Sequence, residues 1–393
     1  MKAGWQIKAI GEVCDVVNGG TPKTGTKEYW GGQHQWVTPA EMGKRNSPYV
    51  GETERTVTDA GLQNSSARML PPYSVILSSR APIGHLVINT EPMATNQGCK
   101  GLVPSDPLHY KFLYYYLSSI VDLLNDLGSG ATFKELSGGK LKEVGIPFPP
   151  LPEQQRIVAI LDAAFDGIAT AKANAEQNLQ NARALFESHL QSVFTQRGEG
   201  WEEKRLGEVY DVRDGTHDSP KYHATGYPLI TSKNLKREGL SFDDVSLINE
   251  RDFTKINQRS AVHKGDVLFA MIGTIGNPTL VTVEPNFAIK NVALFKISQG
   301  QSGAFLKHYL ASGWVISKMM QEAKGSTQKF VGLGYLRDFP INVPPLAKQL
   351  EVVEALDELS AETQRLESLY QRKLAALDEL KKSLLHQAFS GML

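Results

Sequence analysis

The chain has 393 residues, of which 41% are hydrophobic and 21% are charged. This length and composition are typical of a globular protein with two domains and exclude a disordered chain. The formal net charge is zero, whereas a generic nucleic-acid-binding domain is usually basic.

The cysteines and the hydropathy pattern indicate an intracellular protein. Cys14 and Cys99 show no CxxC spacing, so we expect two buried thiols in a reducing compartment and neither a disulfide framework nor a metal site. The chain contains no uncharged apolar run of about 18 residues, and its first ten residues lack the apolar core of a signal peptide. We therefore expect a cytoplasmic protein without a membrane span.

The sequence repeats itself over its whole length. Trp5–Val13 opens the first half, and Trp201–Val209 opens the second half 196 residues later with a similar sequence. Near the end of each half, Pro149-Pro-Leu151 matches Pro344-Pro-Leu346 at a shift of 195 residues. A period this long excludes a solenoid and indicates a duplicated domain. The middles of the halves diverge, so we expect one fold with two different ligands.

Each half begins with short β-branched or apolar runs between Gly, Pro, Asn and Ser clusters, which predict strands of a mixed or antiparallel sheet joined by long polar loops. The predicted strands are Val13–Val17, Trp36–Thr38, Val75–Leu77 and Leu86–Ile88 in the first half and Leu229–Thr231, Val267–Met271, Leu280–Val283 and Val292–Ile297 in the second. An apolar helix follows in each half, at Leu108–Leu127 and Phe305–Ala323. A Gly-rich turn and a short strand then lead to each Pro pair, which can continue neither a strand ladder nor a helix.

A long helix with a heptad pattern is predicted after each Pro pair. In the first helix the two rows are Leu161, Ile168, Ala175, Ala182, His189 and Phe165, Lys172, Leu179, Phe186, Val193. In the second they are Val352, Leu359, Leu366, Lys373, Leu380 and Leu356, Thr363, Tyr370, Leu377, Leu384. This spacing is typical of a coiled-coil seam. The simplest partner of each helix is the other, packed antiparallel, although two unrelated surface helices remain an alternative.

Together these elements predict an α+β protein with two tandem, internally duplicated domains of mixed or antiparallel β-structure with helices. The two long helices, packed as an antiparallel coiled coil, separate the domains. We place the first domain at residues 1–150, the central helix at 151–198, the second domain at 199–345 and the C-terminal helix at 346–393.

Several strings imitate catalytic motifs but lack an essential residue. Leu70-Pro-Pro-Tyr73 resembles the Asn/Asp-Pro-Pro-Tyr motif of amino-methyltransferases, yet leucine has no side-chain acceptor for the target amino group. Gly20–Lys27 resembles a P-loop, with Thr-Lys where Lys-Ser/Thr is required. Because no set of nucleophile, base and orienting group is found, we expect no catalytic, cofactor-binding or metal-binding residues.

The variable loops contain side chains of the types that can contact DNA. Arg or Lys can recognise guanine, Asn or Gln can recognise adenine, and lysines can hold phosphates. The candidates for DNA contact are Lys23, Lys27, His34, Lys44, Arg45, Arg80, Asn96, Gln97, Lys100, Arg213, His217, Lys221, His223, Lys233, Asn234, Lys236, Arg237, Lys290 and Asn291. Arg80 is the preferred candidate because it directly follows the predicted strand Val75–Leu77. For each candidate, a solvated loop side chain is the alternative.

At the family level, the chain resembles the specificity subunits (HsdS) of type I restriction–modification systems. The matching strings are Gly11-Glu-Val13, Gly19–Pro22, Ser78–Gly84, Thr95–Gly98, Pro149–Val158 and Leu384–Gly391. The second half departs from the pattern, since Ile272-Gly-Thr replaces Arg-Ala-Pro and Lys290-Asn-Val replaces Asn-Gln-Gly.

The resemblance implies a non-catalytic subunit with two target-recognition domains, each reading one half of a bipartite double-stranded DNA target through the major groove. It implies two modification subunits, which carry S-adenosylmethionine, docked on the long helices, with restriction subunits in the full complex. Shared phosphate contacts with such partners would account for the neutral charge. A fused restriction–methylation enzyme and a coiled-coil scaffold that binds only proteins are the alternatives.

Overall fold

The computed structural model describes residues 4–80, 82–130, 134–195, 198–236, 238–325 and 329–393. The chain divides into two compact units. Unit 1 comprises Met1–Asn174 and Lys373–Leu393, and unit 2 comprises Ala175–Arg372. Each unit therefore contains one of the duplicated domains together with a part of each long helix. None of the helices in the described ranges is both long and apolar enough to cross a membrane.

The described residues of the domain of unit 1 form ten strands. They are β1 (Gln6–Ala9), β2 (Cys14–Asn18), β3 (Trp30–Val37), β4 (Tyr49–Val50), β5 (Thr56–Val57), β6 (Val75–Ser79), β7 (Ile83–Asn89), β8 (Met93–Thr95), β9 (Cys99–Pro104) and β10 (Gly145–Phe148). Its helices are α1 (Ile10–Val13), the 3-10 turn η1 (Lys27–Tyr29), α2 (Pro39–Met42), α3 (Asp59–Gln63), α4 (Tyr110–Ser119), α5 (Val121–Leu127) and α6 (Gly138–Glu143).

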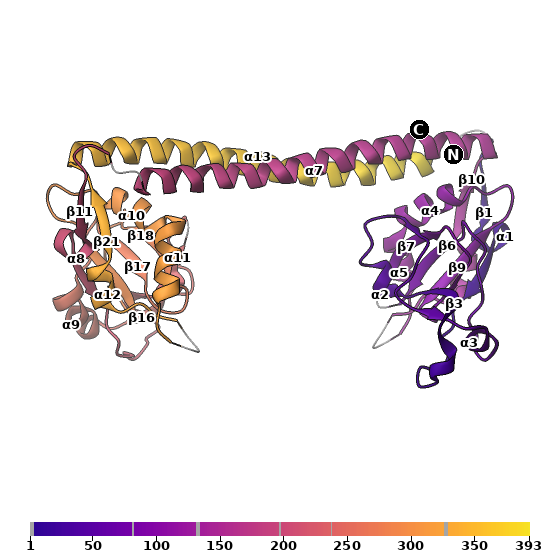
Figure 1. The fold of residues 1–393 in the computed structure, drawn as a ribbon, viewed down its shortest axis with the longest axis horizontal. Coiled ribbons are helices and arrows are strands. Elements are labelled where there is room, and N and C mark those ends of the chain that lie inside the picture. The colour runs from indigo at the N-terminus through magenta and orange to yellow at the C-terminus, as the bar shows by residue number, and fades with distance from the viewer. Residues whose placement is uncertain (1–3, 81, 131–133, 196–197, 237, 326–328) are drawn as a thin grey trace. The chain divides into compact units, whose positions relative to one another are not determined.

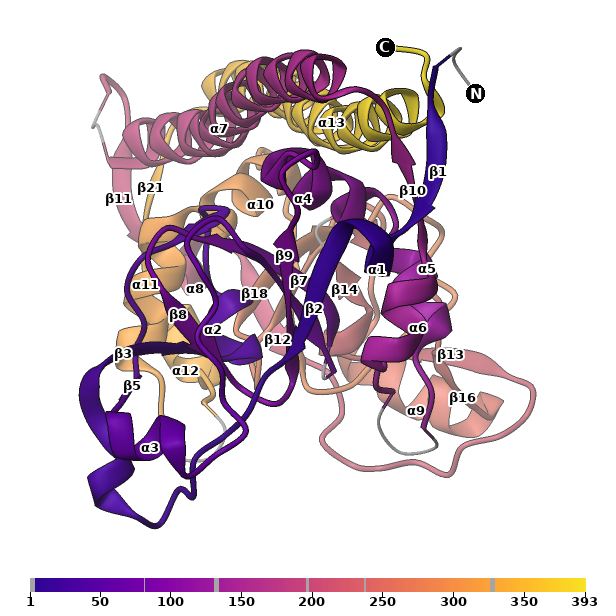
Figure 2. The same ribbon diagram turned by 90° about the vertical axis from the view of Figure 1, so that its right-hand side faces the viewer.

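The main sheet of unit 1 has the order β2-β9-β6-β7-β4, and its pairs are antiparallel except for β4–β7. A smaller sheet, β5-β3-β8, contains one antiparallel and one parallel pair. The strands β1 and β10 pair antiparallel, so the first and last strands of the domain lie together. Figure 1 and Figure 2 show α4 between this main sheet and the long helices.

The core of unit 1 explains the position of α4. Phe112, Leu113, Tyr116 and Leu117 are buried and lie on one face of this helix. They belong to one hydrophobic cluster with strand β6 and with the long helices α7 and α13. Burial of each such side chain contributes about 1.5–3 kcal/mol relative to an exposed one.

Unit 2 repeats this arrangement. Its strands are β11 (Glu202–Arg205), β12 (Asp211–Asp214), β13 (Tyr227–Ile230), β14 (Leu235–Lys236), β15 (Gly239–Leu240), β16 (Ser246–Ile248), β17 (Val267–Ala270), β18 (Gly276–Leu280), β19 (Ala288–Ile289), β20 (Val292–Lys296) and β21 (Pro340–Val343). Its helices are α8 (Leu206–Val209), the 3-10 turn η2 (Ser232–Asn234), α9 (Glu250–Ser260), α10 (Gly303–Ala311), α11 (Gly313–Glu322) and α12 (Leu333–Asp338).

The main sheet of unit 2 is antiparallel with the order β12-β20-β17-β18. The sheet β16-β13-β19 again contains a parallel pair, β14 and β15 form a short antiparallel pair, and β11 pairs with β21 as β1 does with β10. The duplication predicted from the sequence and the mixed α+β class are therefore confirmed.

The two predicted domain helices are each divided in two, so their prediction as single helices was wrong. Ile120 leaves the helical conformation between α4 and α5, with φ −117° and ψ 20°. Ser312 separates α10 from α11, and its hydroxyl donates a hydrogen bond to the Tyr309 carbonyl at 2.8 Å. A serine that bonds the preceding turn competes with the helical hydrogen-bond pattern.

The long helices are α7 (Leu151–Thr195) and α13 (Leu346–Ser390). Within unit 1 they run antiparallel, because Arg156 bonds the Leu393 carbonyl at 2.8 Å while Lys172 bonds Asp378 at 2.7 Å. Within unit 2, Arg183 of α7 bonds Glu367 of α13 at 3.1 Å. The coiled-coil prediction is thus confirmed in each unit.

The heptad pattern of α7 holds for four of the five predicted positions in its first row. Leu161, Ile168, Ala175 and Ala182 are buried. His189 is exposed, and the adjacent Leu190 is buried in its place. The α-helix has 3.6 residues per turn, so a strict seven-residue row drifts around the helix by about 20° per heptad. The last position of the row was therefore predicted one residue too early.

Candidate nucleic-acid interface

In unit 1, four predicted DNA-contact residues meet at the end of the main sheet. Arg80 follows β6, Asn96 and Gln97 lie between β8 and β9, and Lys100 lies in β9. Thr21 receives a hydrogen bond from the Asn96 amide at 3.0 Å and itself donates to the Gln97 side chain. Thr21 and Lys100 are 79 positions apart in the sequence, but the strand order β2-β9-β6 brings Thr21 and the four candidates together.

Glycines at this edge permit close approaches that a side chain would block. A Cβ atom at Gly19 would lie 1.9 Å from the Asn96 carbonyl oxygen, and one at Gly98 would lie 3.2 Å from Nε of Arg80. In unit 2, a Cβ atom at Gly215 would lie 2.2 Å from the Ile289 carbonyl oxygen. Gly19 and Gly215, which match in the repeat, therefore let the chain after β2 approach the β8–β9 loop in unit 1 and the chain after β12 approach the end of β19 in unit 2.

Arg80 is half-exposed, and one of its guanidinium nitrogens lies 3.8 Å from the Glu135 carboxylate. The ammonium of Lys100 lies 4.0 Å from the same carboxylate, but its side chain is only 7% exposed. Burial lowers the pKa of Lys100, and Glu135 partly opposes this effect. Lys100 is therefore corrected from a surface contact to a buried support for Glu135, while Arg80 remains accessible.

The other candidates of unit 1 lie on its loops and on the smaller sheet. Lys23 and Lys27 are exposed, and Lys44 pairs with Glu54 at 3.3 Å. His34 bonds Asp59 at 2.8 Å, and this hydrogen bond lowers the pKa of Asp59. Arg45 bonds the Glu41 carboxylate at 2.6 Å and the Glu52 carbonyl at 2.5 Å, so it links α2 to the segment that carries Glu52.

Arg55 is a further candidate that the sequence did not indicate. Its guanidinium carbon lies 3.7 Å from the centre of the Trp30 ring and 5.2 Å from that of Trp36. The two rings meet edge to face at 5.0 Å. A stacked guanidinium is held in place while its N–H groups remain able to bind a base or a phosphate. A rule based on strand ends could not find Arg55, because the stacking depends on the pairing of β3 with β5.

In unit 2, His217 joins two parts of the predicted site. Its Nδ1 lies 2.8 Å from the Asn291 amide oxygen, and its Nε2 lies 2.8 Å from Asp214. Both hydrogen bonds raise the pKa of His217, and the bond to Asn291 has the larger effect. Arg259 of α9 also bonds Asp214, at 2.7 Å.

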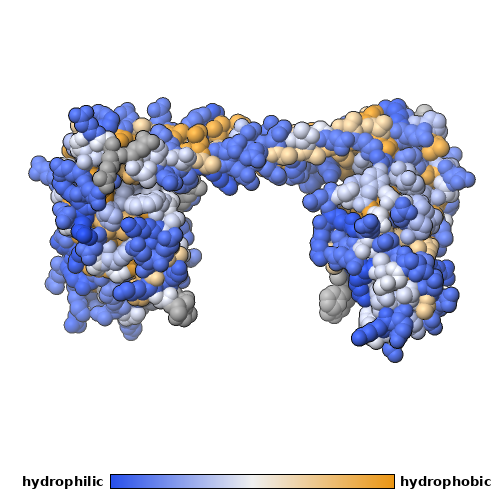
Figure 3. Space-filling model, in the orientation of Figure 1, coloured by the Kyte–Doolittle hydropathy of each residue, from blue (hydrophilic) through white to orange (hydrophobic). Residues whose placement is uncertain are grey.

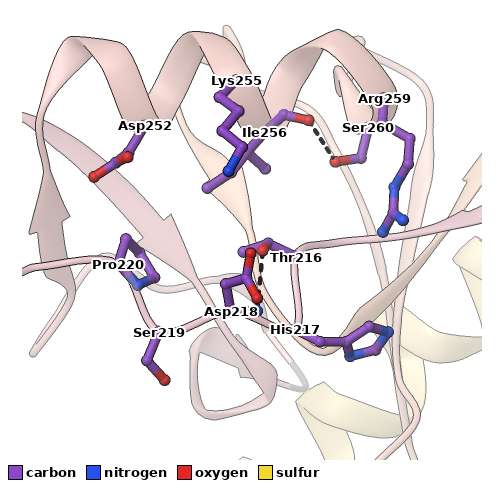
Figure 4. Close-up of a pocket in the computed structure, with 10 residues that line it drawn as sticks. All are labelled: Thr216, His217, Asp218, Ser219, Pro220, Asp252, Lys255, Ile256, Arg259 and Ser260. Carbon is purple, nitrogen blue, oxygen red and sulfur yellow. Dashed lines mark hydrogen bonds between the residues drawn. The ribbon is translucent and has the colours of Figure 1, made fainter.

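A pocket of about 460 Å³ lies between α9 and the loop Thr216–Pro220. Figure 4 shows Lys255 and Arg259 on the helix above the loop that carries His217. Lys290 bonds the Ser219 hydroxyl at 2.7 Å, on the same loop. Cationic side chains from three segments thus gather on one side of unit 2.

The remaining candidates of unit 2 have different environments. Lys221, His223, Lys233 and Lys236 are exposed, and Arg213 pairs with Asp211 at 2.6 Å. Arg237 lies outside the described residues. Asn234 is corrected, because it is only 4% exposed and its amide bonds the backbone of Thr231 at 3.0 Å and of Ser241 at 3.2 Å. Its side chain shapes a turn and is not available to a base.

On the face drawn in Figure 3, the surface of each domain is largely hydrophilic. Within the described residues, no group of three or more His, Cys, Asp or Glu side chains is placed to hold a metal ion. Cys14 and Cys99 are buried free thiols, as expected, and burial raises the pKa of each to about 12. The arrangement offers hydrogen-bond donors, acceptors and cations, which are the groups that a DNA interface uses.

Comparison with known proteins identifies the duplicated domain. The family described as "Type I restriction modification DNA specificity domain" matches residues 2–181 and 198–374. The MjaIX specificity subunit of Methanocaldococcus jannaschii is 28% identical over 362 residues, covering 87% of this chain and 83% of the relative. The EcoBI specificity subunit of Escherichia coli is 24% identical over 360 residues, covering 82% and 74% of the two chains.

Solved structures share the fold over the whole chain. A chain from the type I R-M system, solved in work on complex assembly and conformational transition, has a TM-score of 0.79 at 18% identity and covers 99% of this chain and 98% of its own length. The HsdS subunit from Thermoanaerobacter tengcongensis has a TM-score of 0.67 at 19% identity, with coverage of 100% and 98%. With two matched domains that span most of its length, the chain belongs to the family of type I restriction–modification DNA specificity proteins.

Proposed function

We propose that the chain is the sequence-specificity subunit of a type I restriction–modification complex, in which each domain recognises one half of a bipartite DNA target through the major groove. The observation that supports this most directly is the duplicated domain with different side chains at its equivalent loops. Asn96 and Gln97 of unit 1 occupy the same connection as Lys290 and Asn291 of unit 2, between a strand of the smaller sheet (β8 or β19) and a strand of the main sheet (β9 or β20). One scaffold with two sets of donors and acceptors suits two different half-sites.

We propose that the subunit is non-catalytic and binds no cofactor of its own. It would work in the cytoplasm with two modification subunits, which bind S-adenosylmethionine and transfer the methyl group, and with restriction subunits in the full complex. The curated relatives are specificity subunits of restriction enzymes, which supports this division of labour. The near-neutral charge of the chain fits a shared contact with DNA phosphates.

The two long helices are proposed to set the number of base pairs between the half-sites. Four residues inserted into α7 between Asn174 and Gln177, with a matching insertion in α13, add about 6 Å and roughly one helical turn. We expect unchanged half-sites and a spacer longer by about one to two base pairs, since each base pair spans about 3.4 Å. An active complex with an unchanged spacer would show that its partners fix the distance.

Methylome sequencing of cells with and without this chain tests the proposed function. We expect one bipartite methylated motif that disappears when the chain is absent. A gel-shift assay with selected duplexes separates this function from a scaffold that binds only proteins. A methyl-transfer assay on the chain alone separates it from a fused enzyme, because robust turnover by the pure chain would contradict the proposal.

A further inference from the structure

The two domains contain the same small backbone arrangement at the end of the central strand of the main sheet. In unit 1, Arg80 forms an isolated β-bridge with Glu135, and the Leu136 N–H donates to the Ser79 carbonyl at 2.9 Å. In unit 2, Ile272 forms the same bridge with Phe330, and the Val331 N–H donates to the Met271 carbonyl at 3.0 Å.

The partners of Glu135 and Phe330 also correspond. Glu135 exchanges two backbone hydrogen bonds with Ser129, at 2.9 and 3.1 Å. Phe330 exchanges two with Lys324, at 2.8 and 3.0 Å. The backbone therefore assigns Ile272 to the place of Arg80 and Phe330 to the place of Glu135.

The side chains at this place have opposite character in the two domains. Unit 1 presents a guanidinium and a carboxylate 3.8 Å apart, whereas unit 2 presents two hydrocarbons. Phe330 is 40% exposed, and Ile272 is half-buried beside it. Both line a surface hollow of about 460 Å³, which also includes Leu333 and the polar residues Asp214 and His217.

An exposed phenylalanine next to a polar loop suits a ligand that is partly apolar. In the major groove, the 5-methyl group of thymine is the apolar group that base edges offer, and Phe is among the side chains that contact it. We propose that Ile272 and Phe330 contact a thymine methyl group in the half-site recognised by unit 2. This inference rests on the proposed function and deepens it, because it names the base chemistry that distinguishes the two domains at one equivalent position.

Replacement of thymine by uracil tests the inference without any change to the protein. After the half-sites are known from the methylome, duplexes are made with deoxyuridine at each thymine of the unit 2 half-site in turn, and binding of the full chain with its modification subunits is measured. At one position we expect about fourfold weaker binding, which corresponds to roughly 0.8 kcal/mol for one buried methyl group. The same replacements in the unit 1 half-site serve as the DNA control.

Protein variants assign the effect to the residues. Phe330→Ala should weaken binding to thymine-containing DNA and abolish the difference between thymine and uracil at that position. Phe330→Leu keeps an apolar contact and should retain much of the difference in affinity between thymine and uracil. Arg80→Ala in unit 1 should leave this difference at the unit 2 half-site unchanged. Since Phe330 is partly exposed, we expect the variants to fold, which circular dichroism verifies.

The outcomes separate this inference from the function on which it rests. Specific binding that is insensitive to uracil at every thymine, or a half-site without thymine, would overturn the inference and leave the function intact. Loss of binding to the modification subunits by Phe330→Ala, without any effect of uracil, would assign the hollow to a protein partner and also overturn it. Absence of sequence-specific DNA binding would instead refute the function.

Discussion

The side-chain oxygen of Gln154 accepts a hydrogen bond from the backbone N–H of His109 at 2.8 Å, at the start of α4. Its amide nitrogen donates to the Pro149 carbonyl at 2.8 Å and to the Pro107 carbonyl at 3.0 Å, and the side chain is fully buried. Gln349 of unit 2 does the same for Ser302 at 2.9 Å and Pro344 at 2.9 Å. The repeated Pro-Pro-Leu-x-x-Gln motif thus fixes the beginning of each long helix to the first domain helix of its own unit.

Gln154→Ala should destabilise unit 1 by about 1–3 kcal/mol, because it removes the buried side chain that bonds the His109 N–H and the carbonyls of Pro107 and Pro149. The midpoint of urea unfolding of the full chain, followed by circular dichroism, measures the effect. Gln155→Ala, at an exposed position of the same helix, is the matched control. A shift no larger than that of the control would show that water replaces the glutamine without cost.

Arg80→Ala should weaken binding to the cognate duplex by about 1–3 kcal/mol if the guanidinium contacts a guanine in a bidentate manner. The loss should be greatest for the cognate base pair, so the variant should also tolerate other bases at that position. Competition gel shifts with a set of single-base variants measure both effects, with exposed Arg68→Ala of the same domain as the control. An equal loss on every duplex would identify Arg80 as a phosphate contact.

Exchange of residues 201–345 for the same segment of a relative should change one half-site and leave the other unchanged. The reason is that the segment begins at β11 and ends just after β21, whose pairing closes the second domain on itself. Methylome sequencing of cells that carry the hybrid subunit measures the outcome. If both half-sites changed, the domains would not be independent readers.

The duplication and the helix seam could be predicted from sequence because they depend on local repetition. Matching Trp, Gly, Pro and Gln residues recur at a nearly constant shift, and Leu161 and Ile168 show the burial that heptad spacing demands. Gly313 directly follows the break at Ser312 and was a signal for it, whereas the break at Ile120 lies in an apolar run without Gly or Pro and could not be predicted. There, tertiary packing decides where the chain turns.

The candidate site was less predictable than the fold. Arg80 was selected because it follows the predicted strand Val75–Leu77, and Asn96 and Gln97 because side chains of their type in a variable loop can read adenine. The structure brings all three to one edge of the main sheet. Asn234 has the same residue type and a similar loop position, but its amide is consumed by the turn that it stabilises. Whether a polar side chain bonds its own loop or faces outward depends on backbone conformation, which composition does not determine. The assignment of the contacts to bases or phosphates stays a prediction.

His217 should give the second domain a pH-dependent stability. Its pKa is raised from the ordinary value of 6.5 by the hydrogen bonds to Asn291 and Asp214, so the folded state holds the proton more tightly than the unfolded state. The stabilisation is fully present below the unfolded pKa of about 6.5 and is lost as the pH rises through the higher folded value. The melting temperature of the wild type should therefore exceed that of His217→Gln most at about pH 5.5 and least at about pH 8.5.

Asn291→Gly removes one hydrogen-bond partner of His217, and glycine tolerates the backbone φ of 53° at this position. This variant should reduce the pH dependence without abolishing it. A difference between wild type and His217→Gln that stays constant over this range would show that the imidazole acts there only as a neutral hydrogen-bonding group.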